Sequence, residues 1–266
     1  MKQLAVVGAG VMGETLIAGL LRAGWEPSQI TAVDRHAPRL TEISAKYGIA
    51  NSELAEAVAD AQTVVVVVKP QDTGEVLPQV AAALRPGTLV VSLCAGVTTA
   101  QIEAVMPTGT PVVRVMPNTP AQVDEGMAAI SGGSAATTAN LEFVTGLLEA
   151  VGKVVTVPEK YQDAVTAISG SGPAYLFFVV EAMIDAGVML GLPRDIATTL
   201  VVQTMYGSAK LLAESGAHPT QLRERVTSPG GTTAAALRAL EDHRVKAAFM
   251  TAMEAARDRS RELASS

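Results

Sequence analysis

The chain has 266 residues, of which 48% are hydrophobic and 17% charged, with a formal net charge of −6 at pH 7. That length accommodates one large or two ordinary domains with hydrophobic cores. The negative charge, the lack of a basic tract and an aromatic content of 3% argue against nucleic acid as a partner. A single cysteine, Cys94, excludes an internal disulfide framework, and the histidines His36, His218 and His243 lack the spacing of metal ligands.

The sequence carries no signal for a membrane or for export. The apolar run Tyr175–Ile184 is interrupted by Glu181 and bounded by Asp185, so it falls short of the ~20 residues that span a bilayer. The N-terminus enters a strand-like run at once, without a basic region or a small-residue cleavage site. We therefore expect a cytoplasmic protein.

The N-terminal residues follow the pattern of a strand, a glycine turn and a helix. Leu4–Val7 is an apolar run that ends in Gly8-Ala9-Gly10-Val11-Met12-Gly13, and leucine and isoleucine then recur at helical spacing. In such a turn Gly8 permits the tight bend, Gly10 the approach of a pyrophosphate, and Gly13 the close packing of helix on strand. The pattern predicts a dinucleotide site with contacts from Val7, Gly8, Gly10, Val11, Met12 and Gly13.

Two charged residues bear on the choice of cofactor. A second short strand, Ile30–Val33, delivers Asp34 about 20 residues after the motif, where an acid that binds a ribose is expected. Its carboxylate would accept hydrogen bonds from the adenosine ribose of NAD and repel the 2′-phosphate of NADP, whereas the guanidinium of Arg35 would attract that phosphate. Arg35 equally fits a solvated surface charge, so both NADP and NAD stay open.

The following residues alternate between strand and helix patterns. Thr63–Val68 and Thr88–Leu93 are near-continuous β-branched runs, typical of strands buried on both faces of a parallel sheet. Helices are expected over 38–47, 72–84, 98–106 and 140–150, with a further strand at 112–115 and edge strands at 127–130 and 154–157. The prediction is an α/β Rossmann domain with a mostly parallel sheet over residues 1–157.

Three loops follow strands of this predicted sheet, at the carboxyl ends where open α/β sheets bind ligands. We expect these loops to face the nicotinamide half of the cofactor, with contacts from Val68, Lys69, Pro70, Cys94, Ala95 and Asn118. Lys69 also fits a plain surface lysine, and Asn118 a turn residue. Cys94 fits a small packing residue better than a nucleophile, because no histidine accompanies it.

From residue 158 to 266 the pattern is helical, which predicts an all-α second domain. Ser169-Gly170-Ser171-Gly172-Pro173 should kink or restart a helix. This segment fits a polar notch beside a substrate, with hydroxyls from Ser169 and Ser171, or close helix packing through small residues. The helix that begins near Leu192 is apolar on most sides, which predicts burial against a second subunit.

Val226–Thr233 is the second glycine-rich segment of interest. A helix pattern follows it directly, so we expect Ser228 as the N-cap and Pro229 as the first helical residue. The N–H groups of Gly230, Gly231 and Thr232 would then lack intrahelical partners and face an anion. A merely structural glycine-rich turn is the alternative.

Taken in order, these motifs resemble those of the pyrroline-5-carboxylate reductase family, which has a 6-phosphogluconate dehydrogenase-like C-terminal domain. The matching stretches run along essentially the whole chain: Gly8–Gly13, Val68–Pro70, Ala95–Thr98, Asn118–Pro120, Ser169–Tyr175, Asp185–Val188 with Gly191-Leu192, Gln203-Thr204 and Val226–Thr233. The resemblance implies hydride transfer from NADPH or NADH to the C5=N bond of 1-pyrroline-5-carboxylate, giving L-proline. It also implies a homodimer, often built into a decamer.

The resemblance also implies roles for individual residues. Ser228 Oγ and the N–H groups of Gly230 and Gly231 would hold the substrate carboxylate, with Thr232 and Ser171 nearby, and the Thr233 hydroxyl would bond the ring nitrogen. Asn51 matches a residue that contacts the adenosine ribose or its phosphate. Two other functions stay open. A β-hydroxyacid dehydrogenase would need a catalytic lysine from the first helix of the helical domain, where this chain offers only Lys160. A non-catalytic NADP-sensing regulator would not need the Ser228–Thr233 segment.

Overall fold

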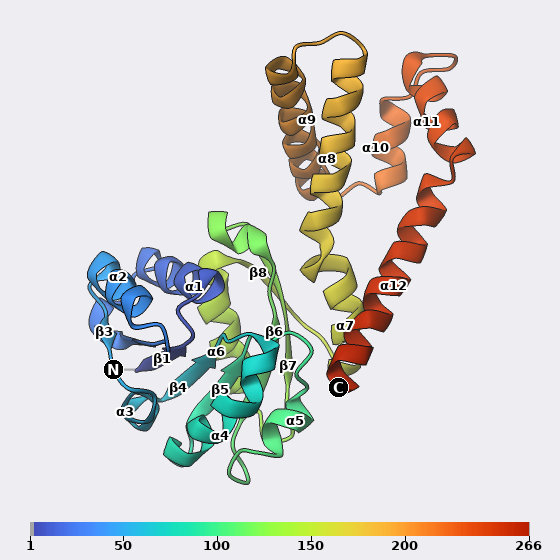
Figure 1. Ribbon diagram of the computed structural model, residues 1–266. Helices are drawn as coiled ribbons and strands as arrows, with labels where there is room; N and C mark the ends of the chain where they lie inside the picture. The colour runs from blue at the N-terminus through green and yellow to red at the C-terminus, as the bar shows by residue number, and fades with distance from the viewer. Residues whose placement is uncertain (1–2, 266) are drawn as a thin grey trace. The chain divides into compact units, whose positions relative to one another are not determined.

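The computed structural model describes residues 3–265, and an eight-stranded sheet occupies the N-terminal part of them. The strands lie in the order β3-β2-β1-β4-β5-β6-β7-β8, and every neighbouring pair is parallel except β6 and β7. Figure 1 shows the sheet and its helices. The strands are β1 (Leu4–Val7), β2 (Ile30–Val33), β3 (Ala50–Asn51), β4 (Thr63–Val66), β5 (Leu89–Ser92), β6 (Val112–Met116), β7 (Gly126–Gly132) and β8 (Gly152–Thr156).

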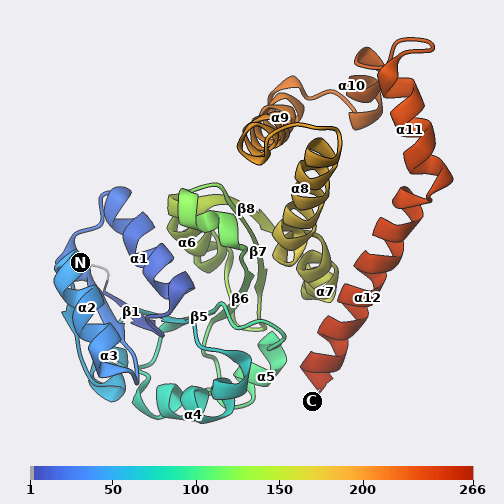
Figure 2. The ribbon, with the colours of Figure 1, turned by 45° about the horizontal axis from the view of Figure 1, so that its top comes forward.

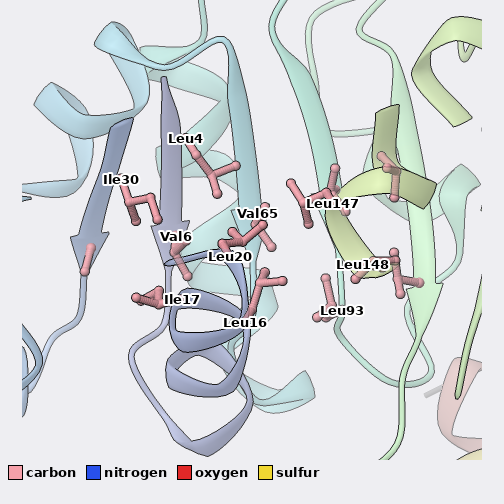
Figure 3. Packing of buried hydrophobic residues seen from close by; sticks show 14 of the residues in the cluster. Leu4, Val6, Leu16, Ile17, Leu20, Ile30, Val65, Leu93, Leu147 and Leu148 are labelled. Carbon is pink, nitrogen blue, oxygen red and sulfur yellow. The ribbon is translucent and has the colours of Figure 1, made fainter. Parts of the chain in front are cut away.

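Helices cover both faces of this sheet. On one face, α1 (Val11–Arg22), α2 (Ala37–Tyr47) and α6 (Thr138–Leu148) pack on Leu4, Val6 and Val65, as Figure 3 shows for α1 and α6. On the other face, α3 (Leu54–Asp60), α4 (Thr73–Ala83) and α5 (Thr99–Glu103) pack on the alternate residues, among them Val64 and Val66. Successive strand residues point to opposite faces, so a strand buried on both needs an unbroken apolar run. The valine run of β4 follows from this requirement.

The remaining residues are helical. A short helix α7 (Gln162–Val165) leads into a π-helix (Thr166–Gly170), and α8 (Gly172–Met189) follows, so the predicted restart at the Ser169–Pro173 segment is confirmed. Figure 2 and Figure 1 both show α8 beside the next helix, α9. The other helices are α9 (Arg194–Ser215), α10 (Pro219–Arg225), α11 (Thr232–Asp242) and α12 (Val245–Ser265).

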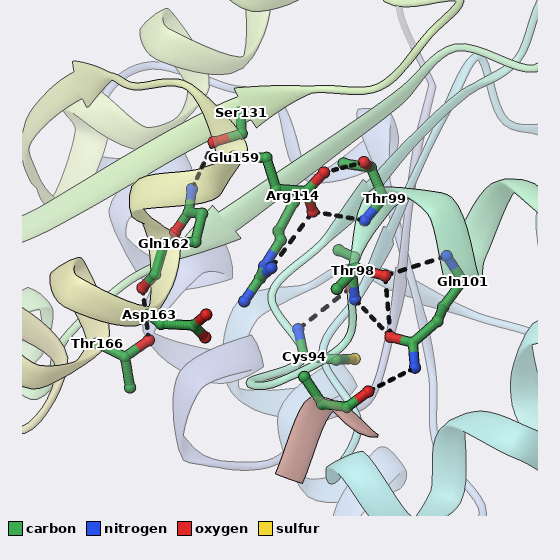
Figure 4. Close-up of polar contacts among 12 residues, drawn as sticks. Cys94, Thr98, Thr99, Gln101, Arg114, Ser131, Glu159, Gln162, Asp163 and Thr166 are labelled. Carbon is green, nitrogen blue, oxygen red and sulfur yellow. Dashed lines mark hydrogen bonds and ion pairs between the residues drawn. The ribbon is translucent and has the colours of Figure 1, made fainter. Parts of the chain in front are cut away.

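The chain divides into two compact units, one of Met1–Ser171 with Ala256–Ser266 and the other of Gly172–Ala255. Polar contacts tie the segment after β8 to the sheet: Glu159 caps the start of α5 through the Thr99 N–H at 2.6 Å and pairs with the buried Arg114 at 3.3 Å. Gln162 Nε2 donates to Ser131 Oγ at 2.8 Å (Figure 4). The domain boundary expected after residue 157 stays a prediction.

The predicted fold class is confirmed, with differences at the level of single elements. The strand β3 and the helix α3 were not expected, and β4 and β5 are shorter than the runs that predicted them. The prediction of two edge strands at the end of the sheet was wrong for β7, which lies between β6 and β8. A strand that reverses direction can still pair on both sides, and alternation along one strand does not reveal how many neighbours it has.

Candidate functional site

The glycine motif forms a tight loop between β1 and α1. Gly8 has φ +112°, a conformation that side chains rarely adopt, and a Cβ on Gly13 would overlap the carbonyl oxygen of Gly8. Gly10 differs, because among residues 3–265 no atom beyond its chain neighbours lies within 4 Å of a Cβ built there. The fold therefore requires the first and third glycines, and the second opens onto free space.

The N-terminus of α1 at this loop presents unused donors. The first intrahelical bond runs from Glu14 N to Gly10 O at 2.9 Å, so the N–H groups of Val11, Met12 and Gly13 precede it. Backbone N–H groups at a helix start, with the positive end of the helix dipole behind them, favour a phosphate. Together with the open space at Gly10, this geometry fits the pyrophosphate of a dinucleotide.

Asp34 is held against the glycine loop. Its Oδ2 accepts a hydrogen bond from Ala9 N at 2.7 Å, and its Oδ1 accepts one from His36 N at 2.8 Å. The carboxylate thus lies at the end of β2 beside the glycine loop, where the sequence pattern predicts an acid that binds a ribose. Arg35 pairs with Asp72 at 3.1 Å, and its side chain is 75% exposed, so the choice between a phosphate ligand and a surface charge stays open.

Arg39 belongs to this end of the site, and sequence reasoning missed it. Its Nε donates to Ala9 O at 3.2 Å, and its guanidinium pairs with Glu14 of α1. Hydrogen bonds from Lys46, the largest effect, and from Tyr47 and Arg39 hold the pKa of the Glu14 carboxyl below its ordinary value. The only sequence signal was an arginine in the first turn of the helix after Asp34.

The predicted residue Asn51 lies on the neighbouring strand β3, where its Nδ2 donates to Ser44 Oγ at 2.9 Å.

The loops after β4 and β5 meet at one edge of the sheet, because these strands are parallel neighbours. Lys69 and Ala95 are exposed there, whereas Cys94 is 1% exposed and its Sγ lies 3.6 Å from Val66 O. Burial raises the pKa of the Cys94 thiol. The interpretation of Cys94 as a packing residue is confirmed, since its side chain is buried in the hydrophobic core on one face of the sheet.

The buried thiol predicts a dependence of stability on pH. The unfolded thiol ionises near pH ~8.5, while the folded one keeps its proton, so the free energy of unfolding should fall as pH rises above that value. Below about pH 8 this contribution is fully present. Urea unfolding at neutral and alkaline pH should show a steeper loss for the parent chain than for Cys94→Ala. Parallel losses in the two chains would show that this thiol does not titrate differently on folding.

Asn118 uses both ends of its side-chain amide within the protein. Its Nδ2 donates to Ser169 O at 3.1 Å, and its Oδ1 accepts from Met127 N at 2.8 Å. The structure therefore brings the loop after β6 to the segment that carries Ser169 and Ser171.

The segment Val226–Thr233 corrects one expectation. Ser228 is not the N-cap and Pro229 is not helical: α11 begins at Thr232 with Gly231 as its N-cap. Gly230 has φ +68°, in the left-handed region, which ends any right-handed helix, and the Gly231 N–H donates to Ser228 O at 3.0 Å. The Gly231 N–H is therefore engaged and is not the free donor expected.

The corrected helix start still has backbone N–H groups of the kind that bind an anion. The first intrahelical bond runs from Ala235 N to Gly231 O at 3.1 Å, so the N–H groups of Thr232 and Thr233 precede it. A Cβ on Gly231 would overlap Ser228 Oγ, which places that hydroxyl at the same turn. Donors from a hydroxyl and a helix start are suited to a carboxylate.

Comparisons with protein families cover both halves of the chain. Residues 159–263 match the model described as pyrroline-5-carboxylate reductase dimerisation, and residues 3–96 match the one described as NADP oxidoreductase coenzyme F420-dependent. The pyrroline-5-carboxylate reductase of Mycobacterium tuberculosis is 43% identical, with 99% of this chain and 97% of the relative covered. That of Corynebacterium melassecola is 44% identical, with 99% of each covered.

Solved structures agree with these matches. A pyrroline-5-carboxylate reductase from Coxiella burnetii superposes with a TM-score of 0.94 at 33% identity, covering 98% of each chain. The pyrroline carboxylate reductase of Plasmodium falciparum, solved with NADP bound, superposes with a TM-score of 0.87 at 30% identity, covering 99% of this chain and 98% of the other.

Proposed function

We propose, from the premise that the chain belongs to the pyrroline-5-carboxylate reductase family, that it transfers hydride from NADPH or NADH to C5 of 1-pyrroline-5-carboxylate and yields L-proline. The observation that carries the proposal is the similarity over 99% of the chain, which includes the glycine loop and the Ser228–Thr233 turn together. A non-catalytic NADP sensor would require the first of these segments and not the second.

The cofactor, when bound, supplies the hydride, and the chain's own residues orient it. The start of α1 and Gly10 would hold the pyrophosphate, and Asp34, Arg35 and Asn51 would lie at the adenosine end. The loops after β4, β5 and β6 would contact the nicotinamide end of the cofactor. The contacts would come from Val68, Lys69, Pro70, Cys94, Ala95 and Asn118. Because the Cys94 side chain is buried, only its backbone is suited to such a contact.

The substrate is small, with one carboxylate and one imine nitrogen, so recognition needs an anion site and one hydrogen bond. Ser228 Oγ and the N–H groups at the start of α11 would hold the carboxylate, and a contact from the Gly230 N–H stays a prediction. The Thr233 hydroxyl would bond the ring nitrogen and keep its proton in place. A protonated imine is the better hydride acceptor, so this bond favours the reaction without a strong acid.

Oxidation of NADPH in the presence of 1-pyrroline-5-carboxylate tests the function. We expect turnover that depends on both components and releases proline. Cofactor binding without turnover would contradict the proposal and favour a sensor. Turnover of a β-hydroxyacid in its place would favour the related dehydrogenases.

The second copy of this chain is the partner we propose, as a homodimer in the cytoplasm. Large apolar side chains are exposed on α8 and α9: Leu176, Phe177, Phe178, Met183, Ile196, Leu200, Val202, Tyr206, Leu211 and Leu212. The helical stretch Glu159–Met189 is long and apolar enough to cross a membrane, and 11% of its most apolar window is buried within the chain. Its match to a dimerisation domain supports a protein partner for this surface. Assembly of dimers into a decamer stays a prediction.

Phe178→Asp should break this dimer. Phe178 is 72% exposed in the single chain, and an unpaired carboxylate in a dimer interface should weaken association by about 100-fold or more. Val123→Asp is the matched control, because Val123 is 70% exposed but lies outside the helical unit. Sedimentation should give a monomer for the first variant and the parent mass for the second. A dimer in both would place the interface elsewhere.

A further inference from the structure

The π-helix Thr166–Gly170 is an irregular element that the proposed function does not yet use. Its widened turn is closed by the bond from Ser171 N to Thr166 O at 2.8 Å, which spans five residues where an α-helix spans four. A π turn thus holds one residue more than an α turn. If it relaxed to α geometry, the residues that follow would rotate by about 100° around the helix axis.

Two contacts from the end of β6 hold this turn. Asn118 donates its amide N–H to Ser169 O at 3.1 Å, and a Cβ on Gly170 would overlap the Met116 side chain. Met116 and Asn118 therefore meet the consecutive residues 170 and 169 of the π-helix. The α-helical partner of Ser169 O would be the N–H of residue 173, but Pro173 has none, so this carbonyl needs a donor from outside the helix and the Asn118 amide supplies one.

The orientation of the Asn118 amide is determined by its two partners. Its oxygen faces the Met127 N–H at 2.8 Å and its nitrogen faces a carbonyl, so a flipped amide would oppose like groups on both sides. Asn118 therefore joins three segments, namely its own loop, the start of β7 and the π-helix. One of the two N–H groups of this amide is thus committed to the π-helix, and a contact of Asn118 with the cofactor falls to the second N–H or to the backbone.

We propose that Asn118 is a positioning residue that maintains the π-helix and so sets the direction of the Ser171 hydroxyl. Ser171 follows the π-helix directly, and its contact with substrate rests on the proposed function. The consequence is specific: the bond from Asn118 to Ser169 governs the productive placement of the substrate, and cofactor affinity is nearly independent of this bond.

Asn118→Asp isolates the contact with the π-helix. The carboxylate keeps an acceptor for the Met127 N–H but sets an oxygen against Ser169 O in place of a donor. We expect kcat/KM for 1-pyrroline-5-carboxylate to fall by about tenfold or more, while the dissociation constant of NADPH, titrated without substrate, changes by less than about threefold. Asn140→Asp is the matched control, since the Oδ1 of Asn140 accepts only from Thr137 and a carboxylate keeps that acceptor. A weaker affinity for NADPH with unchanged substrate kinetics would overturn the proposal in favour of a direct cofactor contact.

A second readout does not depend on catalysis. Hydrogen exchange of the backbone around residues 166–171 should be faster in Asn118→Asp than in the parent chain and in Asn140→Asp. Unchanged exchange in Asn118→Asp would overturn the positioning role even if the chain proved to catalyse another reaction.

Discussion

Gly10→Ala should leave the chain folded and weaken the binding of NADPH and NADH by at least about tenfold, which corresponds to ~1.4 kcal/mol. The added methyl group meets no described atom within 4 Å, so the protein itself does not oppose it. It occupies the space through which a pyrophosphate would approach the N–H groups at the start of α1. Cofactor titration by fluorescence and thermal unfolding of the same samples measure the two effects.

Gly13→Ala is the matched comparison, three residues further along the same motif. Here a Cβ would overlap the carbonyl oxygen of Gly8, which is backbone and cannot move aside cheaply. Overpacking of this kind costs roughly 1–3 kcal/mol or more, and each kcal/mol lowers the melting temperature of a domain of this size by about 2–4 °C. We expect Gly13→Ala to lose stability and Gly10→Ala to keep it. Equal melting temperatures, or unchanged cofactor affinity in Gly10→Ala, would contradict the assignment of the loop.

Thr233→Ala should lower kcat by about 100-fold while the affinity for NADPH stays within a factor of about three. Thr233 lies in the first turn of α11, close to the Ser228 turn in sequence, and its hydroxyl is the group that we assign to the ring nitrogen. Without this bond the imine loses the partner that keeps its proton in place during hydride transfer. Steady-state kinetics with 1-pyrroline-5-carboxylate, together with cofactor titration, separate the two quantities.

Thr233→Ser controls for the helix start itself. Serine keeps the hydroxyl and removes only the methyl group, so its kcat should remain near that of the parent chain. If Thr233→Ala retained full turnover, the proton-orienting role would be wrong, although the anion site could still stand on Ser228 and the backbone donors. Ser228→Ala should then act chiefly on the KM for the substrate, because its contact is to the carboxylate.

Local patterns in the sequence predicted most of the fold correctly. The strands β1 and β2 have the predicted bounds, and the unbroken valines of β4 announced a strand buried on both faces. The two-residue strand β3 escaped detection because no periodicity can appear over so short a run. The start of α11 was misplaced because Pro229 fits a first helical turn in isolation, and only the left-handed conformation of Gly230 reveals a separate turn before the helix.

In the candidate site, too, local features could be predicted from the sequence and long-range contacts could not. The glycine loop and the acid after β2 follow from chemistry within one strand-turn-helix unit, whose spacing the sequence displays directly. The hydrogen-bond partners of Asp34 and Arg39 cannot be predicted in this way. Arg39 donates to Ala9 O across 30 residues, and the two residues meet only when β2 and α2 pack beside β1. The bond between Asn118 and Ser169 spans 51 residues and depends on a π turn that no propensity scale describes.

The amino-acid order was thus sufficient for the class of fold and the dinucleotide loop, because each rests on backbone preferences and burial patterns within about 30 residues. It was also sufficient for the family, because short motifs match in order along the whole chain. Folding was needed to show which donors remain free. Backbone and amide groups must find partners wherever the packed chain supplies them. The bonds of Asn118 and Asp34 to distant segments, and that of Gly231 to the turn before it, therefore became visible only in three dimensions.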